Sequence, residues 1–236
     1  MNKIIVSKIF SILTIFSTAS FALDVDKHLD LSYVQTSGNT NTTTFSSKLE
    51  GTAGLSDTQS VRAKGSILYN ENDNSTSANK YNLELDYNHM INKKLYANMG
   101  INYLKDELSD YDYRLNIGPG LGYKILEDEI QTIDIQGGLD YAYDKYNDGL
   151  KDNYLAGRGE LNYKYRFSEN VEFKQMISYL SSFEDGKKYF AVSDSAIGVK
   201  MTHNLSLGVS YNMDYTNKTE KEKLDTKFLT SLIVDF

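Results

Sequence analysis

The chain has 236 residues, of which 25 are Lys or Arg and 32 are Asp or Glu, so its formal net charge at pH 7 is −7. This acidic balance argues against nucleic acid as a partner. Cysteine is absent, which excludes disulfides, a lipid-modified N-terminal cysteine and any site that needs a thiolate.

The N-terminal segment, residues 1–22, is typical of a secretory signal peptide. A basic start and an apolar run from Ile9 to Phe16 are followed by small residues up to Ala22, where we expect cleavage. A membrane-anchor helix would need about 20 consecutive apolar residues, and Ser and Thr interrupt this run. Residues 23–236 then form the expected domain, with 25 − 2 = 23 basic residues and a formal charge of 23 − 32 = −9.

Apolar and polar residues alternate in twelve segments of this domain, as expected for β-strands with one apolar and one polar face. The 19 Tyr residues and the single Pro also favour strands. Because the period is two and not 3.6, a helical-repeat architecture is rejected. The predicted strands are residues 29–33, 45–55, 61–69, 81–87, 95–103, 113–125, 133–143, 155–167, 171–183, 189–201, 205–215 and 228–236.

The predicted connections are of two kinds. Short polar turns lie near residues 57, 93, 128, 169 and 203, and longer connections are expected near residues 37–42, 71–79, 105–111, 146–152, 184–188 and 217–223. This spacing leaves each strand room for the roughly 9 to 11 residues with which a tilted strand crosses a bilayer. The pattern predicts an all-β, antiparallel, up-and-down transmembrane β-barrel of the outer-membrane type in a Gram-negative bacterium, with the short turns and both termini in the periplasm.

Alternation alone also fits a soluble sandwich or a lipocalin-like barrel, in which the apolar face points inward. The aromatic residues favour the membrane, because Tyr and Phe gather toward the ends of the apolar faces, as at Tyr103 and Tyr143. The polar faces are then expected to line the lumen. Their charged residues include Arg62, Glu84, Asp86, Arg114, Asp134, Asp140, Arg158, Glu160, Lys164 and Arg166.

The stretch LNIGPGLGY, Leu115 to Tyr123, contains three glycines around the only proline. Its G-x-G-x-G spacing differs from the G-x-G-x-x-G fingerprint of dinucleotide sites. We expect Gly118, Gly120 and Gly122 to face the lumen, where they make room or let the sheet bend, and Pro119 to face lipid at a β-bulge. Close approach of a ligand to this thin part of the wall is the alternative.

No pattern indicates catalysis, a cofactor or a bound metal. The three histidines, His28, His89 and His203, lack the spacing of metal ligands. An outer-membrane lipid hydrolase would need a Ser–His pair, and His89 is the only lipid-facing candidate. The loop from Asp144 to Asn153 departs from an EF-hand and is expected to be a hairpin turn on Asn147, Asp148 and Gly149. We therefore expect a protein that is not an enzyme.

A family resemblance rests on three segments: SGNTNTTTF from Ser37 to Phe45, YRLNIGPGLGY from Tyr113 to Tyr123, and LDTKFLTSLIVDF from Leu224 to Phe236. On these segments the chain resembles the salt-induced outer-membrane protein family (YdiY-like), a family of unknown function. The resemblance covers nearly the whole domain and implies an envelope role under osmotic stress, without established chemistry. The last segment also resembles the signal read by the barrel-assembly machinery, at Phe228, Leu232, Val234 and Phe236.

Two functions remain open at this stage. The first is a narrow passive pore or envelope component, in which the near balance of basic and acidic residues predicts weak discrimination between ions. The second is a structural or adhesive barrel whose lumen is plugged by salt bridges and does not conduct. The expected partners are outer-membrane lipids, lipopolysaccharide with divalent ions at the acidic loops, and the assembly machinery.

Overall fold

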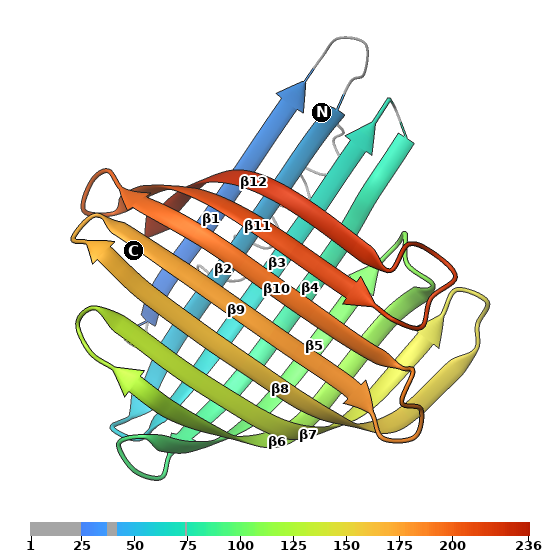
Figure 1. The fold of residues 1–236 in the computed structure, drawn as a ribbon, viewed down its shortest axis with the longest axis horizontal. Coiled ribbons are helices and arrows are strands. Elements are labelled where there is room, and N and C mark those ends of the chain that lie inside the picture. The colour runs from blue at the N-terminus through green and yellow to red at the C-terminus, as the bar shows by residue number, and fades with distance from the viewer. Residues whose placement is uncertain (1–24, 37–41, 74) are drawn as a thin grey trace.

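The computed structural model describes residues 25–36, 42–73 and 75–236. The expected signal peptide, residues 1–22, and residues 37–41 of the SGNTNTTTF segment lie outside the described residues. The described residues form twelve strands (Figure 1): β1 (Val25–Thr36), β2 (Thr42–Ser56), β3 (Gln59–Asn72), β4 (Ser75–Met90), β5 (Leu95–Asp106), β6 (Tyr111–Glu127), β7 (Gln131–Tyr146), β8 (Lys151–Ser168), β9 (Val171–Ser182), β10 (Tyr189–Lys200), β11 (Leu205–Thr216) and β12 (Leu224–Asp235).

The strands form a closed barrel in which each one pairs antiparallel with its chain neighbours and β12 returns to β1. Figure 1 shows β8 to β12 crossing in front of β1 to β5. This order arises because short connections keep consecutive strands adjacent. The predicted all-β, antiparallel, up-and-down barrel of twelve strands is confirmed, and every predicted segment overlaps the corresponding strand.

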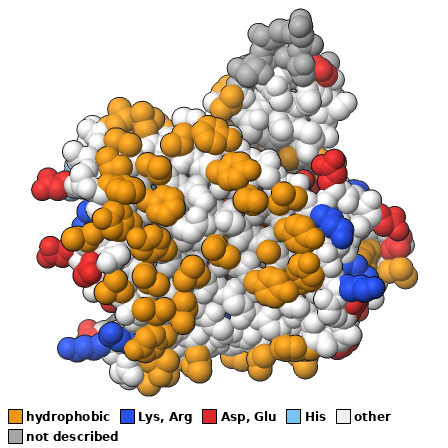
Figure 2. All heavy atoms as spheres, in the orientation of Figure 1, with side chains coloured by type: hydrophobic (Ala, Val, Ile, Leu, Met, Phe, Trp, Pro, Cys, Tyr) orange, Lys and Arg blue, Asp and Glu red, His pale blue; other side chains and the backbone are white. Residues whose placement is uncertain are grey.

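The outer wall of the barrel is apolar. Leu139 in the middle of β7 and Leu155 on β8 are 61% and 56% exposed, which is the reverse of a soluble protein. Figure 2 shows apolar side chains over the wall and charged side chains gathered at the two ends. Strands of 12 to 18 residues are long enough to cross a bilayer at a tilt. This apolar band identifies an outer-membrane-type barrel and rules out the inside-out soluble alternative.

The two ends of the barrel differ in their connections. One end, the turn end, carries the connections 57–58, 91–94, 128–130, 169–170 and 201–204. It also carries the start of β1 and the end of β12, where Lys27 and Phe236 exchange two backbone hydrogen bonds. The other end, the loop end, carries the connections 107–110, 147–150, 183–188 and 217–223, together with the ladder pairs Thr36–Thr42 and Asn72–Ser75.

One expected long connection is wrong. Instead of a loop over residues 71–79, β3 and β4 continue to Asn72 and Ser75, and these two residues pair directly. The tight turn places Asp73 at a φ of 46°, a left-handed conformation that Asp tolerates. Polar residues continue the ladder here because both faces of a strand that extends beyond the bilayer meet water, so the alternation ends before the strand does.

The expected bulge at Pro119 is also wrong. The register shifts of β6 against β7 lie between Tyr111 and Tyr113 and between Lys124 and Leu126. At Pro119 the register is unchanged, and the β6–β7 ladder simply omits the pairs of Gly118 and Pro119. A proline lacks the backbone N–H, so the ladder is interrupted without an extra residue.

In the part of the chain that the structure describes, no helix is long and apolar enough to cross a membrane.

Candidate functional site

The inward face is identified by a contact that crosses the barrel. Nζ of Lys80 on β4 lies 2.5 Å from Oδ2 of Asp214 on β11, and β3, β2, β1 and β12 separate these strands in the barrel order. Both side chains therefore point into the lumen, and every second residue of each strand shares this face. We call this pair the cross-lumen bridge. Lys227 of β12 lies 3.2 Å from the same carboxylate.

The register places the ten charged residues singled out in the sequence on this inward side. Five cross-strand ion pairs include seven of them: Arg62–Asp86 (2.9 Å), Lys64–Glu84 (3.2 Å), Arg114–Asp144 (3.2 Å), Arg158–Asp140 (3.2 Å) and Lys164–Glu172 (2.9 Å). Asp134 and Glu160 instead accept hydrogen bonds from the neutral side chains of Tyr96 and Asn162. Arg166 lies at the turn end and donates to the carbonyl oxygen of Glu129.

The three glycines of β6 lie where a side chain or the neighbouring backbone occupies the place of a Cβ. A Cβ on Gly122 would lie 2.0 Å from Cζ of Tyr96, and one on Gly120 would lie 2.4 Å from Oδ1 of Asn98. One on Gly118 would lie 2.0 Å from the backbone oxygen of Leu139, so here glycine permits close approach of β7.

Tyr96 and Asn98 use this space to link β5 to β7 over the intervening strand. The Tyr96 hydroxyl donates to Asp134 at 2.7 Å, and Nδ2 of Asn98 donates to Gln136 at 2.6 Å. Neither residue was predicted from the sequence. A tyrosine on a polar face, beside a strand that carries glycine on the same face, is the signal that could have found them.

A buried ionic cluster occupies the lumen near the loop end. Asp144 is 0% exposed and contacts Arg114 at 3.2 Å and Nζ of Lys188 at 2.6 Å. Lys188 reaches inward from the connection 183–188 and also binds Asp152 at 2.8 Å. The Tyr154 hydroxyl donates to Asp144 at 3.0 Å. Burial alone would lower the pKa of Lys188, but its hydrogen bonds to the two carboxylates outweigh this and raise it.

The connection 217–223 crosses the loop end. Its Thr219 hydroxyl and Glu220 N–H donate to Asp110, and Nζ of Lys221 donates to the carbonyl oxygens of Leu108 and Ser109. Lys218 binds Asp185 at 2.6 Å. This connection, which we call the strap, thus joins β11–β12 to the connections 107–110 and 183–188. Such contacts narrow the mouth of the barrel.

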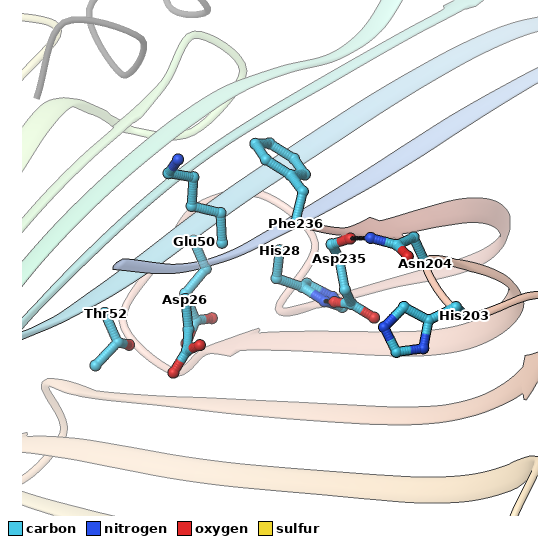
Figure 3. Close-up of a pocket in the computed structure, with 9 residues that line it drawn as sticks. Asp26, His28, Glu50, Thr52, His203, Asn204, Asp235 and Phe236 are labelled. Atoms are coloured by element: carbon cyan, nitrogen blue, oxygen red, sulfur yellow. Dashed lines mark hydrogen bonds and ion pairs between the residues drawn. The ribbon is translucent and has the colours of Figure 1, made fainter. Parts of the chain in front are cut away.

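A cavity of about 470 Å³ lies at the turn end (Figure 3). Its lining residues are Asp26, Lys27, His28, Glu50, Thr52, His203, Asn204, Asp235 and Phe236. Nδ1 of His28 lies 2.6 Å from Oδ1 of Asp235, and Nε2 lies 3.3 Å from Asp30. The fold therefore brings together two histidines that are distant in sequence, which the sequence analysis did not foresee.

The described residues include the three histidines and the loop that the sequence analysis weighed for catalysis or metal binding. Among them, no group of three or more His, Cys, Asp or Glu side chains is arranged to hold a metal ion. Nδ1 of His89 is buried without a hydrogen-bond partner among the described residues. In the loop once considered for calcium, Asp144 and Asp152 bind Lys188, and Gly149 completes a tight turn with a φ of 87°.

A family model described as "Protein of unknown function, DUF481" matches residues 29–236. The chain belongs to this family. The family match is consistent with the YdiY-like resemblance seen in the sequence. The comparison with curated proteins found no match to this sequence.

Solved outer-membrane barrels share the fold of this DUF481 protein. The NanC porin is 12% identical with a TM-score of 0.53, over 90% of this chain and 99% of that chain. The COG4313 outer membrane channel from Pseudomonas putida F1 is 10% identical with a TM-score of 0.57, over 91% and 96%. The translocator domain of autotransporter NalP from Neisseria meningitidis is 10% identical with a TM-score of 0.52, over 98% and 95%. Similarity at these identities shows the fold alone.

Proposed function

We propose that this DUF481 protein is a narrow passive channel of a bacterial outer membrane, without catalytic activity. The apolar band between two charged ends supports a membrane location. The meeting of the start of β1 and the end of β12 with the short turns supports a periplasmic turn end and an external loop end. Phe228 on the last strand and Phe236 directly after it are 69% and 57% exposed and are available to the barrel-assembly machinery. Lipopolysaccharide is the proposed neighbour of the loop end.

The observation that carries the proposal is the polar lumen with its cross-lumen bridge. Charged and amide side chains line the inward face, so ions and small polar solutes meet partners there and not hydrocarbon. Lys80 and Asp214 limit the width, because one Lys–Asp contact spans from β4 to β11. Since most inward charges are paired with opposite charges, the channel should discriminate weakly between cations and anions.

Recording currents across planar bilayers tests this function. The purified protein should give small stepwise conductances, and Lys80→Met should enlarge the steps because it removes the bridge while Asp214 keeps Lys227. Lys145→Met is a matched control, since Lys145 shares Asp112 with Lys105 in the same three-residue arrangement away from the bridge. Enlarged steps in the control, or unchanged steps in Lys80→Met, would contradict the assignment of the bridge.

A plugged structural barrel is the second candidate. It is favoured by the strap and by the buried Asp144 cluster, which together occupy the loop end. If neither the parent protein nor Lys80→Met gave conductance steps in the bilayer recordings, this function would be supported over the channel.

We further propose an envelope role under salt stress, as the family resemblance implies. A strain that lacks the protein should grow more slowly than its parent at raised osmolarity and equally well at low osmolarity. Complementation by the parent chain should restore growth, and equal growth of both strains would remove the salt-stress role.

A further inference from the structure

The barrel is closed along only part of the seam between β1 and β12. Lys27 and Phe236 exchange backbone hydrogen bonds of 3.1 and 3.0 Å, and the ladder continues to the pair Leu31 and Leu232. The described residues form no β1–β12 ladder pair beyond this point, although β1 continues to Thr36 and β12 begins at Leu224. In Figure 1 the loop ends of β1 and β2 diverge from β12. The β1–β12 ladder has four residue pairs, whereas each of the other ladders has at least ten.

We call residues 32–36 of β1 and 224–231 of β12 the outer seam. Alternate residues of an antiparallel strand direct their backbone N–H and C=O groups toward opposite neighbours. Because Phe236 is bonded to β1, the same parity on β12 directs the backbone groups of Thr226, Phe228 and Thr230 toward the outer seam. They lie on the loop-end half of the strand, which is in the outer leaflet in the orientation proposed above. Hydrocarbon cannot satisfy such groups, and open sheet edges do not face lipid.

The two sides of the outer seam differ in chemistry. On the outside, Phe228 and Tyr33 are 69% and 58% exposed and present aromatic surface to lipid. On the inside, Ser231 and Lys227 of β12 and the nearly buried Ser32 of β1 lead to the polar lumen. A molecule that occupies the seam therefore meets aromatic side chains on one side and hydrogen-bonding groups on the other.

We propose that the outer seam binds a single-chain amphipath of the fatty-acid type and lets it pass between the lumen and the outer leaflet. The head group, a carboxyl or hydroxyl, hydrogen-bonds the edge of β12. The single tail lies along Phe228 and Tyr33, because one missing ladder leaves space for one extended chain. This function is additional to ion conduction and does not depend on it.

Photolabelling tests the site. The full chain is placed in vesicles of phosphatidylcholine and phosphatidylglycerol that contain a fatty acid with a diazirine in its acyl chain, and labelled residues are located by mass spectrometry. We expect label on the inward side chains Leu229 and Ser231 as well as on Phe228. Val192, an inward residue of β10 whose strand is paired on both sides, should stay unlabelled. Label confined to outward side chains around the whole barrel would overturn the proposal.

A cysteine lock sharpens the test, since the chain has no cysteine of its own. If the register of the paired segment continued, Val34 would oppose Leu229. Oxidation of a Val34→Cys, Leu229→Cys variant should abolish the inward label. Oxidation of the control Leu31→Cys, Leu232→Cys, within the paired segment, should leave it unchanged. Inward label that persists in the first lock, or a disulfide that joins two chains there, would overturn the proposal. A silent bilayer recording would refute the channel but not this site.

Discussion

Replacing Gly122 by Ala should destabilise the barrel, because the ring of Tyr96 occupies the place of the new methyl group. A Cβ at this position would lie 2.0 Å from Cζ and 2.4 Å from the hydroxyl oxygen of Tyr96. The ring cannot simply move aside, since its hydroxyl donates to Asp134 at 2.7 Å.

The magnitude follows from these two contacts. Overpacking costs about 1–3 kcal/mol, and loss of a hydrogen bond to a charged group costs about 1.5–3 kcal/mol more. Gly122→Ala should therefore lower the free energy of unfolding by about 2.5–6 kcal/mol. In a Tyr96→Ala background the clash is absent, and the same change should be neutral or stabilise by about 0.5–1 kcal/mol, the ordinary advantage of Ala over Gly in a strand.

Urea unfolding of the barrel folded into vesicles measures both effects as a double-mutant cycle. Gly54→Ala is the control, because a Cβ there would meet nothing within 4 Å, and it should change stability little. If Gly122→Ala lowered the free energy of unfolding equally with and without Tyr96, the proposed clash between the new methyl group and the Tyr96 ring would be refuted.

Three further outcomes are expected. Leu139→Arg, on the apolar wall, should cost about 2–4 kcal/mol of folding free energy in vesicles, and a variant as stable as the parent would contradict lipid exposure. Asp144→Asn should cost about 3–5 kcal/mol, because it leaves Arg114 and Lys188 buried without this carboxylate, whereas Asp148→Asn in the exposed turn should be neutral. The pKa of Lys188 is raised, so its ion pairs stabilise the cluster fully below the ordinary Lys pKa of about 10.4. This stabilisation is lost as the pH rises through the raised pKa, where Lys188 loses its charge. The conductance should therefore increase at that alkaline pH, and Lys188→Met should show the same increase at neutral pH; a flat pH profile would contradict it.

The twelve strands were predictable from sequence because every strand of a membrane barrel has one face toward lipid and one toward the lumen. A residue such as Leu139 meets lipid and its neighbour Asp140 meets the lumen, so the period of two persists wherever the strand crosses the bilayer. Chain-neighbour pairing then determines the strand order. Residues Ser75 to Asn79 carry no such alternation although they belong to β4, and this is why the connection after β3 was predicted too long.

The lumen contacts were much less predictable. Whether Lys80 contacts Asp214 depends on the stagger of the strands around the barrel. This stagger accumulates over all the strands and cannot be inferred from the sequence of any one of them. The same holds for His28 and His203, which share the turn-end cavity, and for the incomplete ladder between β1 and β12. Glycine on the polar face marked Gly118, Gly120 and Gly122 as unusual, but the side chains that cover them lie on another strand.

Thiol labelling in intact outer membranes tests the central claim most directly, that lipid covers the apolar face and water fills the lumen. Single cysteines replace Leu139 and Val209 on the apolar face, and Ser66 and Ser178 on the inward face, where their ladder partners include Lys48 and Glu160. The account predicts that a membrane-impermeant maleimide modifies Ser66→Cys and Ser178→Cys, while only a lipid-soluble maleimide modifies Leu139→Cys and Val209→Cys. Modification of the latter pair by the impermeant reagent, with the former pair protected, would contradict it.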